Sequence, residues 1–443
     1  GTLPTGGSTQ LSFATVFLQT DVMNSYAMWD TLEWSGVGLD IGYHDGGYYV
    51  FSVNALNSSE AGGSGNYFTH VTRDGGATWQ SPFTQFADCG AREAGKQWRS
   101  VGIEPTSNRL LKFHPSDSAF AVSCAHDISG LVTEDGGARW RLLTVGINTI
   151  YDVAFDPAQP YVIIAVTGNF HDWPHMWYGD VLVANGNVLI SYDRGRSFHI
   201  LGDEASSTAC DGCTDMRRQL LSVAYDHAAD IVYAGSHSVG VARLTGALYG
   251  NGTSAWEWLQ EGMYGADAPL SSGLIVPQIE IDPVNGRVYA ILSGNKHGAV
   301  LTNENRTGVY AMARGGSAWT PLRSSAAPPL YPEGEGTADA IPWRYPTSFA
   351  IDLRAGGDRS VIYLADYEKY NYLGGGIWKS SDGGATWQFK THFAWPVRLT
   401  IDHNRPSRVY ASGNADITMW GKVPQRRQWG FGGSLFTDNG GDT

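Results

Sequence analysis

The sequence has little charge, few cysteines and no long hydrophobic run. Only 16% of its 443 residues are charged, whereas 12% are aromatic. A disordered chain would have more charged and fewer aromatic residues. No run of about 18 apolar residues is present, so we expect no membrane partner. The 30 Lys and Arg are outnumbered by 43 Asp and Glu, giving a net charge of -13. Because nucleic acids bind to basic surfaces, and this chain is acidic, we expect no nucleic-acid partner either.

Three glycosylation sequons favour a secreted chain. They lie at Asn57, Asn251 and Asn305, and such sites are used in the secretory pathway. The sequence also starts at Gly1 rather than at Met, which is typical of a mature form after removal of a signal peptide. We therefore expect an extracellular glycoprotein.

The four cysteines favour disulfides in that location. Pairing neighbours along the chain gives Cys89–Cys124 and Cys210–Cys213, one of three possible connectivities. A zinc site would need two more ligands, and the usual second C-x-x-C is absent. Participation of Cys210 and Cys213 in a metal site stays open, and we expect no cofactor.

One short phrase recurs along the chain. It places Asp, two Gly and an aromatic residue at fixed spacing, in complete form at 73–79, 134–140 and 381–387 and in weaker or truncated form at 192–198, 313–319 and 437–443. In a hairpin the aspartate accepts hydrogen bonds from turn N–H groups, and glycine supplies the positive φ. We therefore predict that Asp74, Asp135 and Asp382 are structural.

A second phrase precedes the first and consists of two alternating strands with a turn between them. It occurs seven times, at 38–54, 110–126, 151–169, 221–238, 278–295, 349–367 and 399–414. Two strands here and two around each Asp-Gly-Gly turn make one four-stranded blade. The sequence thus predicts an all-β chain, a single seven-bladed β-propeller domain spanning 1–443, in which the strand at 11–20 closes the last blade. We expect a monomer.

These phrases resemble the Asp-box repeats of sialidases, of glycoside hydrolase family 74 xyloglucanases and of sortilin-type receptors. The sialidase Arg-Ile-Pro is absent, which argues against that family. Family 74 enzymes carry an aspartate in a phrase like Thr-Asp-Ile-Gly-Gly, which Asp127 in Ala125–Gly130 and Asp416 in 414–417 resemble. That family uses two propellers with a cleft between them, so a single propeller would build its site differently.

Most long insertions are predicted at one end of the blades. They fall between the second and third strands or between blades, at 54–67, 88–108, 169–186, 202–218, 261–277, 324–346, 366–375 and 414–433. Long loops on a rigid scaffold commonly carry binding and catalysis. We expect the active site in a funnel at this end.

The candidate catalytic residues are carboxylates, histidines and a tyrosine in these insertions. Asp127 is the first candidate for acid or base, and the full set is Asp127, Asp416, Asp366, Asp172, His126, His171 and Tyr178. Aromatic rings can stack on sugars, and arginines can neutralise acidic sugars. The substrate-binding candidates are Trp173, Trp177, His175, Arg217, Arg218, Trp343, Arg344, Trp395 and Trp420.

Three functions fit this pattern. Paired carboxylates favour a glycoside hydrolase acting on a polysaccharide or oligosaccharide. A His or Tyr base beside arginines would suit a lyase for a uronate-containing glycan. The third is a propeller that binds a glycan or protein without chemistry. The sugar, its linkage, the stereochemical outcome and exo or endo action are not specified by the sequence.

Overall fold

A computed structural model gives the structure of the chain. It describes residues 50–57, 59–64, 69–75, 84–86, 98–100, 108–125, 129–143, 145, 149–168, 186–202, 220–237, 239–250, 255–263, 274–294, 306–323, 343, 345–354, 356–367, 376–393, 396–402, 404–413 and 433–441. These ranges contain strands and turns and no α-helix. Within them, no helix has the length and hydrophobicity needed to cross a membrane.

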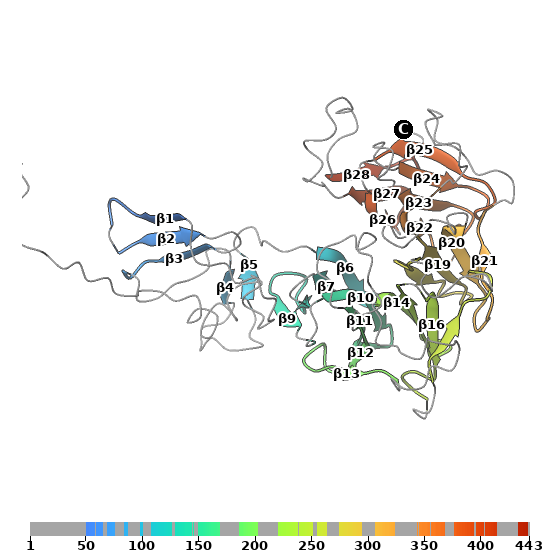
Figure 1. The fold of residues 1–443 in the computed structure, drawn as a ribbon, viewed down its shortest axis with the longest axis horizontal. Coiled ribbons are helices and arrows are strands. Elements are labelled where there is room, and N and C mark those ends of the chain that lie inside the picture. The colour runs from blue at the N-terminus through green and yellow to red at the C-terminus, as the bar shows by residue number, and fades with distance from the viewer. Residues whose placement is uncertain are drawn as a thin grey trace, which may run out of the picture. The chain divides into compact units, whose positions relative to one another are not determined.

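Seven antiparallel sheets of three or four strands make up the described fold (Figure 1). They are β1 (Val50–Val53), β2 (Ala61–Ser64) and β3 (Thr69–Thr72); β6 (Asn108–His114), β7 (Asp117–Ala125), β8 (Gly130–Thr133) and β9 (Arg141–Leu143); β10 (Thr149–Asp156), β11 (Gln159–Gly168), β12 (Val188–Ser191) and β13 (His199–Ile200); β14 (Leu220–Asp226), β15 (Ile231–Ser236), β16 (Val241–Thr245) and β17 (Glu257–Leu259); β18 (Ile279–Ile281), β19 (Val288–Leu292), β20 (Gly308–Met312) and β21 (Thr320–Pro321); β22 (Pro346–Ile351), β23 (Ile362–Asp366), β24 (Gly376–Ser380) and β25 (Gln388–His392); and β26 (Pro396–Asp402), β27 (Arg405–Gly413) and β28 (Gly433–Thr437). A separate pair joins β4 (Thr84–Phe86) to β5 (Trp98–Ser100). The fold is the all-β, seven-bladed arrangement that the sequence predicts.

The chain divides into two compact units. One contains residues 1–106 and 133–142, and the other contains 107–132 and 143–443. In the second unit, consecutive sheets follow one another, and the first strands β10 and β14, and β22 and β26, lie side by side (Figure 1). The expectation of a single domain over 1–443 stays a prediction.

Six of the seven predicted strand pairs form as expected. In each, the first two strands of a sheet pair in antiparallel fashion; a tight turn around Asp156 and Gln159 joins β10 to β11, and the longer segment 352–361 joins β22 to β23. Of the first predicted pair, 38–54, the part before residue 50 lies outside the described residues. Residues 54–67, expected to be a long loop, contain β2, which pairs with both β1 and β3. The sequence of β2, Ala-Gly-Gly-Ser, has low strand propensity, so backbone pairing rather than side-chain preference places it in the sheet.

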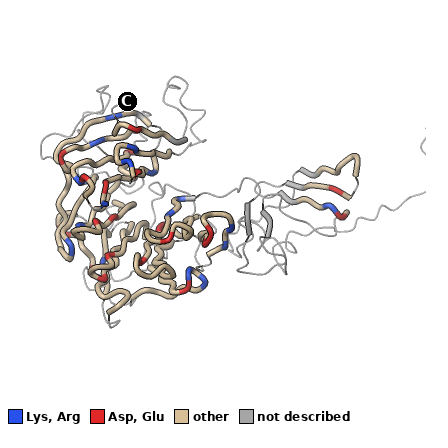
Figure 2. The backbone as a smooth tube through the Cα atoms, turned by 180° about the vertical axis from the view of Figure 1, so that it is seen from behind, with Lys and Arg blue, Asp and Glu red and all other residues tan. Residues whose placement is uncertain are grey.

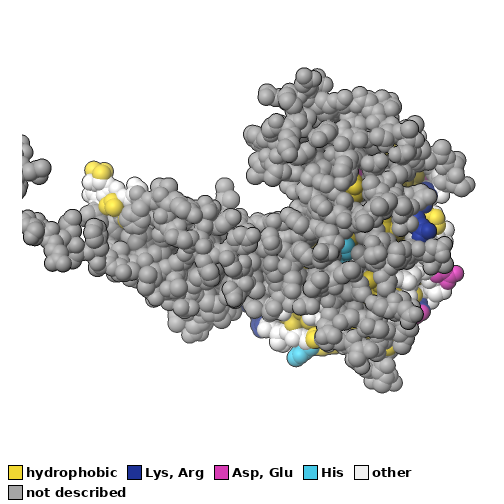
Figure 3. Space-filling view, viewed as in Figure 1, with side chains coloured by type: hydrophobic (Ala, Val, Ile, Leu, Met, Phe, Trp, Pro, Cys, Tyr) yellow, Lys and Arg dark blue, Asp and Glu magenta, His cyan; other side chains and the backbone are white. Residues whose placement is uncertain are grey.

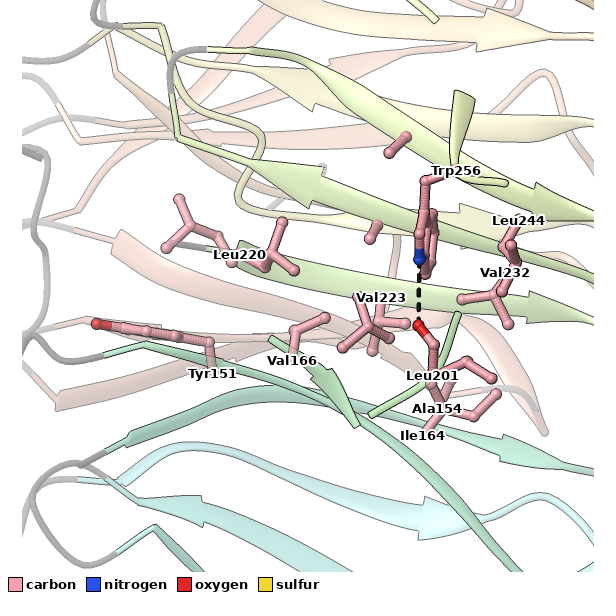
Figure 4. Packing of buried hydrophobic residues seen from close by; sticks show 14 of the residues in the cluster. Tyr151, Ala154, Ile164, Val166, Leu201, Leu220, Val223, Val232, Leu244 and Trp256 are labelled. Carbon is pink, nitrogen blue, oxygen red and sulfur yellow. Dashed lines mark hydrogen bonds between the residues drawn. The ribbon is translucent and has the colours of Figure 1, made fainter. Parts of the chain in front are cut away.

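Apolar side chains from neighbouring sheets interlock in the second unit. Figure 4 shows one such cluster, in which Ile164 of β11 lies near Val223 of β14 and Val232 of β15. Similar clusters fill the other boundaries between successive sheets from β6 to β28. Burying one such side chain contributes about 1.5–3 kcal/mol, so these layers hold the sheets together.

A bulge at the start of the first strand recurs in five sheets. The register shifts between Asn108 and Leu110 in β6, and at matching places in β10, β14, β22 and β26. An extra residue re-aims the side chains that follow it. Asp152, Ser222 and Ser348 come directly after such shifts, and each is buried and bonds to the next sheet.

The last sheet has three strands among the described residues, and β28 lies at its edge. The strand expected at 11–20 to close this sheet lies outside the described residues.

Basic and acidic residues are interspersed along the described backbone (Figure 2). Visible hydrophobic and charged side chains also lie beside one another in the space-filling view (Figure 3).

Candidate functional site

The two ends of the sheets differ in the length of their connections. Because antiparallel strands alternate in direction, the first-to-second and third-to-fourth connections share one end, here called the short-turn end. In the sheets from β6 to β28, that end has tight turns such as 115–116 and 157–158. The opposite end, here called the long-connection end, carries the longest connections, 169–187, 201–219, 322–345 and 414–432.

Aspartates of the Asp-Gly-Gly turns are engaged within their own turns. Asp382 Oδ1 accepts hydrogen bonds from Ser380 Oγ at 2.8 Å and Thr386 N at 2.8 Å, and its Oδ2 accepts from Thr386 Oγ1 at 2.6 Å. Ser380 Oγ also accepts from Gly384 N at 2.8 Å. Gly383 and Gly384 have φ of 73° and 93°, values that favour glycine. The aspartate therefore closes a turn, as the sequence predicts.

The same geometry recurs in the other copies. Asp135 Oδ1 accepts from Thr133 Oγ1 and Arg139 N, both at 2.9 Å. Asp193 Oδ2 accepts from Ser197 Oγ at 2.6 Å. The Ser or Thr two residues before the aspartate is thus part of the motif, and sequence reasoning missed it although the hydroxyl is present in each of these copies.

A second series of aspartates at this end pairs with cations of the following sheet. Asp226 accepts from Arg314 Nε at 2.7 Å and Nη2 at 3.2 Å. Asp282 accepts from Arg359 Nε at 2.8 Å and Nη2 at 2.9 Å. Each aspartate ends a first strand or follows it and is buried. These pairs fasten neighbouring sheets to one another.

Asp156 occupies the equivalent place in the sheet of β10. Its Oδ1 lies 2.8 Å from His227 Nδ1, and its Oδ2 accepts from the Tyr249 hydroxyl. That hydrogen bond raises the pKa of Tyr249 to about 12, because ionising the phenol would remove the donor. The carboxylates described at the short-turn end are therefore committed to turns and inter-sheet contacts.

A cavity of about 420 Å³ also opens among the first strands of the second unit. Its lining comes from β18, β22 and β26 and the turns after them, with Pro115 from the turn after β6. The polar groups are Glu280, Arg398, Arg354 and Thr400 together with the buried Gln278. Because the lining runs from Gln278 and Arg398, at the upstream ends of β18 and β26, to the turns after these strands, the cavity extends along the first strands to the short-turn end.

Asp366 is one of two predicted site residues that the structure describes. It ends β23 and is fully buried. Its Oδ1 accepts a hydrogen bond from Tyr345 N at 2.9 Å. This contact fixes the backbone entering β22, which makes Asp366 a positioning residue in the described structure.

The prediction of Trp343 as an exposed sugar platform is wrong. Only 1% of its surface is exposed, and its ring packs edge to face on Trp378 at 6.1 Å and Trp387 at 5.0 Å. Tyr345 and Tyr367, which border the same connection and the one after β23, are buried in another apolar cluster. An aromatic ring in a long connection still gains more from apolar burial than from exposure.

The prediction of a Cys89–Cys124 disulfide is also wrong. Cys124 is a free cysteine buried in the apolar cluster between two sheets. Burial raises the pKa of its thiol, because a thiolate would be poorly solvated there. Its side chain therefore acts as a small core residue.

The other predicted site residues lie outside the described residues. They are Asp127, Asp416, Asp172, His126, His171, Tyr178, Trp173, Trp177, His175, Arg217, Arg218, Arg344, Trp395 and Trp420. All of them belong to connections of the long-connection end. Cys89, Cys210 and Cys213 are likewise outside the described ranges.

Comparison with known proteins gives distant structural likeness. No protein-family model and no curated protein matches the chain. A family 74 xyloglucanase from Xanthomonas campestris has 18% identity and a TM-score of 0.49, over 82% of this chain and 46% of that one. A family 74 enzyme from Niastella koreensis has 13% identity and a TM-score of 0.46, over 69% and 43%. YCF48 from Cyanidioschyzon merolae has 16% identity and a TM-score of 0.45, over 79% and 87%. The chain therefore spans less than half the length of these two hydrolases.

Proposed function

We propose that the chain is a secreted glycoside hydrolase that cleaves a polysaccharide or oligosaccharide at the long-connection end. The observation that supports this proposal is that the aspartates described at the opposite end are engaged in turns and ion pairs. There, Asp135, Asp193 and Asp382 close turns, and Asp226 and Asp282 pair with arginines. The carboxylates that we propose for the chemistry are therefore those in the long connections.

Hydrolysis of a glycosidic bond needs one protonated acid and one ionised base or nucleophile. Asp127 is the proposed first member, because it lies in the connection that leaves the buried strand β7 and enters β8. Asp416 and Asp172 are the proposed partners, from the connections after β27 and β11. Asp366 is not carried forward, since its carboxylate is fully buried.

The substrate class is proposed from the composition of the connection 169–187. It contains Trp173, Trp177 and Tyr178 beside Asp172 and Asp180. Aromatic faces stack on the apolar faces of sugar rings, and carboxylates accept from sugar hydroxyls. The same combination is proposed to hold a glycan across the ends of several sheets.

The test compares two aspartates on either side of β8. Asp127→Asn is expected to lower turnover by about 10²- to 10⁴-fold, the usual contribution of a general acid or base. Asp135→Asn is the matched control, because the same chemical change falls in a turn at the short-turn end. It should lower thermal stability and leave turnover near normal. Reducing ends released from a panel of polysaccharides give the activity.

Two other results would overturn the hydrolase proposal. Products that carry the ultraviolet absorbance of an unsaturated uronate would indicate a lyase, and His171→Ala or Tyr178→Phe should then abolish the reaction. Retained glycan binding without either product would indicate a binding protein. Normal turnover of Asp127→Asn would remove that residue from the mechanism.

A further inference from the structure

We propose that the cavity between β18, β22 and β26 is a binding site for a small organic carboxylate with an apolar body, anchored by Arg398. The cavity extends along the first strands to the short-turn end and uses none of the residues assigned to hydrolysis. The proposal therefore stands independently of the proposed function. It would give the chain a second site for a small molecule.

The anchor is an arginine that forms an ion pair but no hydrogen bond among the described residues. Arg398 Nη2 lies 3.6 Å from Glu280 Oε1, which is too long for a hydrogen bond. No hydrogen bond of its guanidinium is found within the described ranges. Its side chain is 28% exposed and therefore mostly shielded from water.

Other arginines of the same unit make paired hydrogen bonds to a carboxylate, which Arg398 does not. Arg314 and Arg359 each make paired hydrogen bonds to a buried aspartate. Arg354, which also lines the cavity, does the same with Asp352 at 2.8 Å for both contacts. A planar guanidinium is shaped to receive a carboxylate through two parallel bonds. Arg398 retains that capacity.

The surrounding charges favour an anion. Lys112 pairs with Asp152 at 3.1 Å, and the buried Arg109 donates to Pro277 O at 3.0 Å. Among the residues that line the cavity, Arg354 and Arg398 outnumber Glu280, in a chain whose net charge is -13.

The walls define the rest of the ligand. Most of the lining is apolar, contributed by Ile281, Phe349, Ile351, Leu353, Leu399 and Ile401. Small-molecule sites commonly have volumes of about 300–1,000 Å³ and combine apolar walls with a few polar groups. A ring or short alkyl chain would contact these walls while its carboxylate met Arg398. Glu280 would oppose the ligand by charge repulsion.

Calorimetry on the full chain tests this arrangement with benzoate and hexanoate as probes. Benzamide and hexanamide are the neutral counterparts and should bind at least about tenfold more weakly, since a charged hydrogen bond is lost. Arg398→Gln should weaken benzoate binding by at least about tenfold. Arg405→Gln, in the neighbouring strand β27 and outside the lining, is the matched control and should leave binding unchanged.

Glu280→Gln supplies an independent arm, because removing the opposing carboxylate should tighten benzoate binding and raise its salt dependence. This arm stays informative if Arg398→Gln fails to melt cooperatively. Equal affinity for benzoate and benzamide would overturn the proposal, as would the absence of binding by both carboxylates. Unchanged affinity in a folded Arg398→Gln variant would also overturn it.

Discussion

At the scale of single residues, a hydroxyl and a carboxylate act together in the Asp-Gly-Gly turns. Ser380 donates to Asp382 and accepts from Gly384 N. Thr133 and Ser191 do the same in their copies. The Ser380 hydroxyl thus accepts from one backbone N–H and holds the Asp382 carboxylate where it accepts from Thr386 N and Thr386 Oγ1. Both side chains are therefore needed to satisfy the donors of the turn.

The pKa of Asp382 provides a test of this cooperation. Hydrogen bonds from the Thr386 hydroxyl, Thr386 N and Ser380 lower that pKa from 3.8 to about 2. Thr386→Val removes the largest contribution and should raise the pKa toward 3.8, as measured by NMR titration of the side-chain carboxyl. Thr391→Val, in β25 and outside the turn, should leave it unchanged.

The sign of the pH effect follows from the same shift. A carboxyl whose pKa is depressed by folding stabilises the native state above its unfolded pKa, and this contribution is lost as pH falls through the folded value. The difference in free energy of unfolding between the native sequence and Asp382→Asn should therefore become smaller as the pH falls from 3.8 to about 2. A difference that stays constant over this window would contradict the assigned role.

At the scale of strands and sheets, tryptophans fasten three of the sheets to the one before. Trp256 Nε1 donates to Leu201 O at 3.1 Å (Figure 4), and Trp319 Nε1 donates to Leu259 O at 3.0 Å. Trp387 Nε1 is shared between Leu322 O at 3.1 Å and Gly384 O at 3.0 Å. The aromatic residue of the repeated phrase therefore anchors its own turn and the preceding sheet.

Replacing Trp387 should show this double role. Trp387→Phe keeps a ring in the core and removes the indole donor, so the free energy of unfolding should fall by about 1–3 kcal/mol, the cost of leaving buried acceptors unpaired. Trp140→Phe is the matched control, because among the described residues that indole donates to Gly137 O in its own turn and to no carbonyl of another sheet. Chemical denaturation should give the smaller loss for Trp140→Phe; equal losses would contradict the inter-sheet role.

At the scale of the whole molecule, buried polar contacts link successive first strands of the second unit. Asp152 accepts from Lys112 Nζ at 3.1 Å and from Val223 N at 3.0 Å. Gln278 Oε1 accepts from Ser348 Oγ at 2.9 Å and Phe349 N at 3.0 Å. Because each contact lies at a boundary between sheets, it fixes the register of one sheet against the next.

Gln278→Leu should therefore destabilise the molecule although it adds an apolar side chain to a buried position. Ser348 Oγ and Phe349 N lose their acceptor, and we expect the free energy of unfolding to fall by about 2–4 kcal/mol. Gln260→Leu is the control, since Gln260 donates to Val239 O within its own sheet. A Gln278 variant as stable as the control would show that these contacts contribute little.

Much of this architecture is predictable because its signals are local. Alternating strands around tight turns identify β10 and β11, and the spacing of Asp and Gly identifies the turn at Asp382. The partner of Asp226 is not predictable in the same way, since Arg314 is far along the chain and no local pattern joins them. Trp343 was misjudged for a similar reason, because burial in a long connection depends on neighbouring sheets.

The candidate site is predictable only as a region. For the sheets from β10 to β28, the predicted insertions fall between the second and third strands or between sheets, in agreement with the strand order, whereas 54–67 and 88–108 contain the strands β2 and β5. The roles of Asp127 and Asp416 stay predictions, because both lie outside the described residues. The cavity beside Arg398 gave no sequence signal, since its lining comes from three separate first strands.

The direction of the tryptophan bonds has a consequence for synthesis. Trp256, Trp319 and Trp387 each reach back to a carbonyl made earlier in the chain. A sheet emerging from the ribosome thus meets a partner that has already left it. Contacts between neighbours in sequence also cost little loop-closure entropy. The three sheets from β14 to β25 can accordingly be added in order from the amino-terminal side, each packing on the sheet already formed.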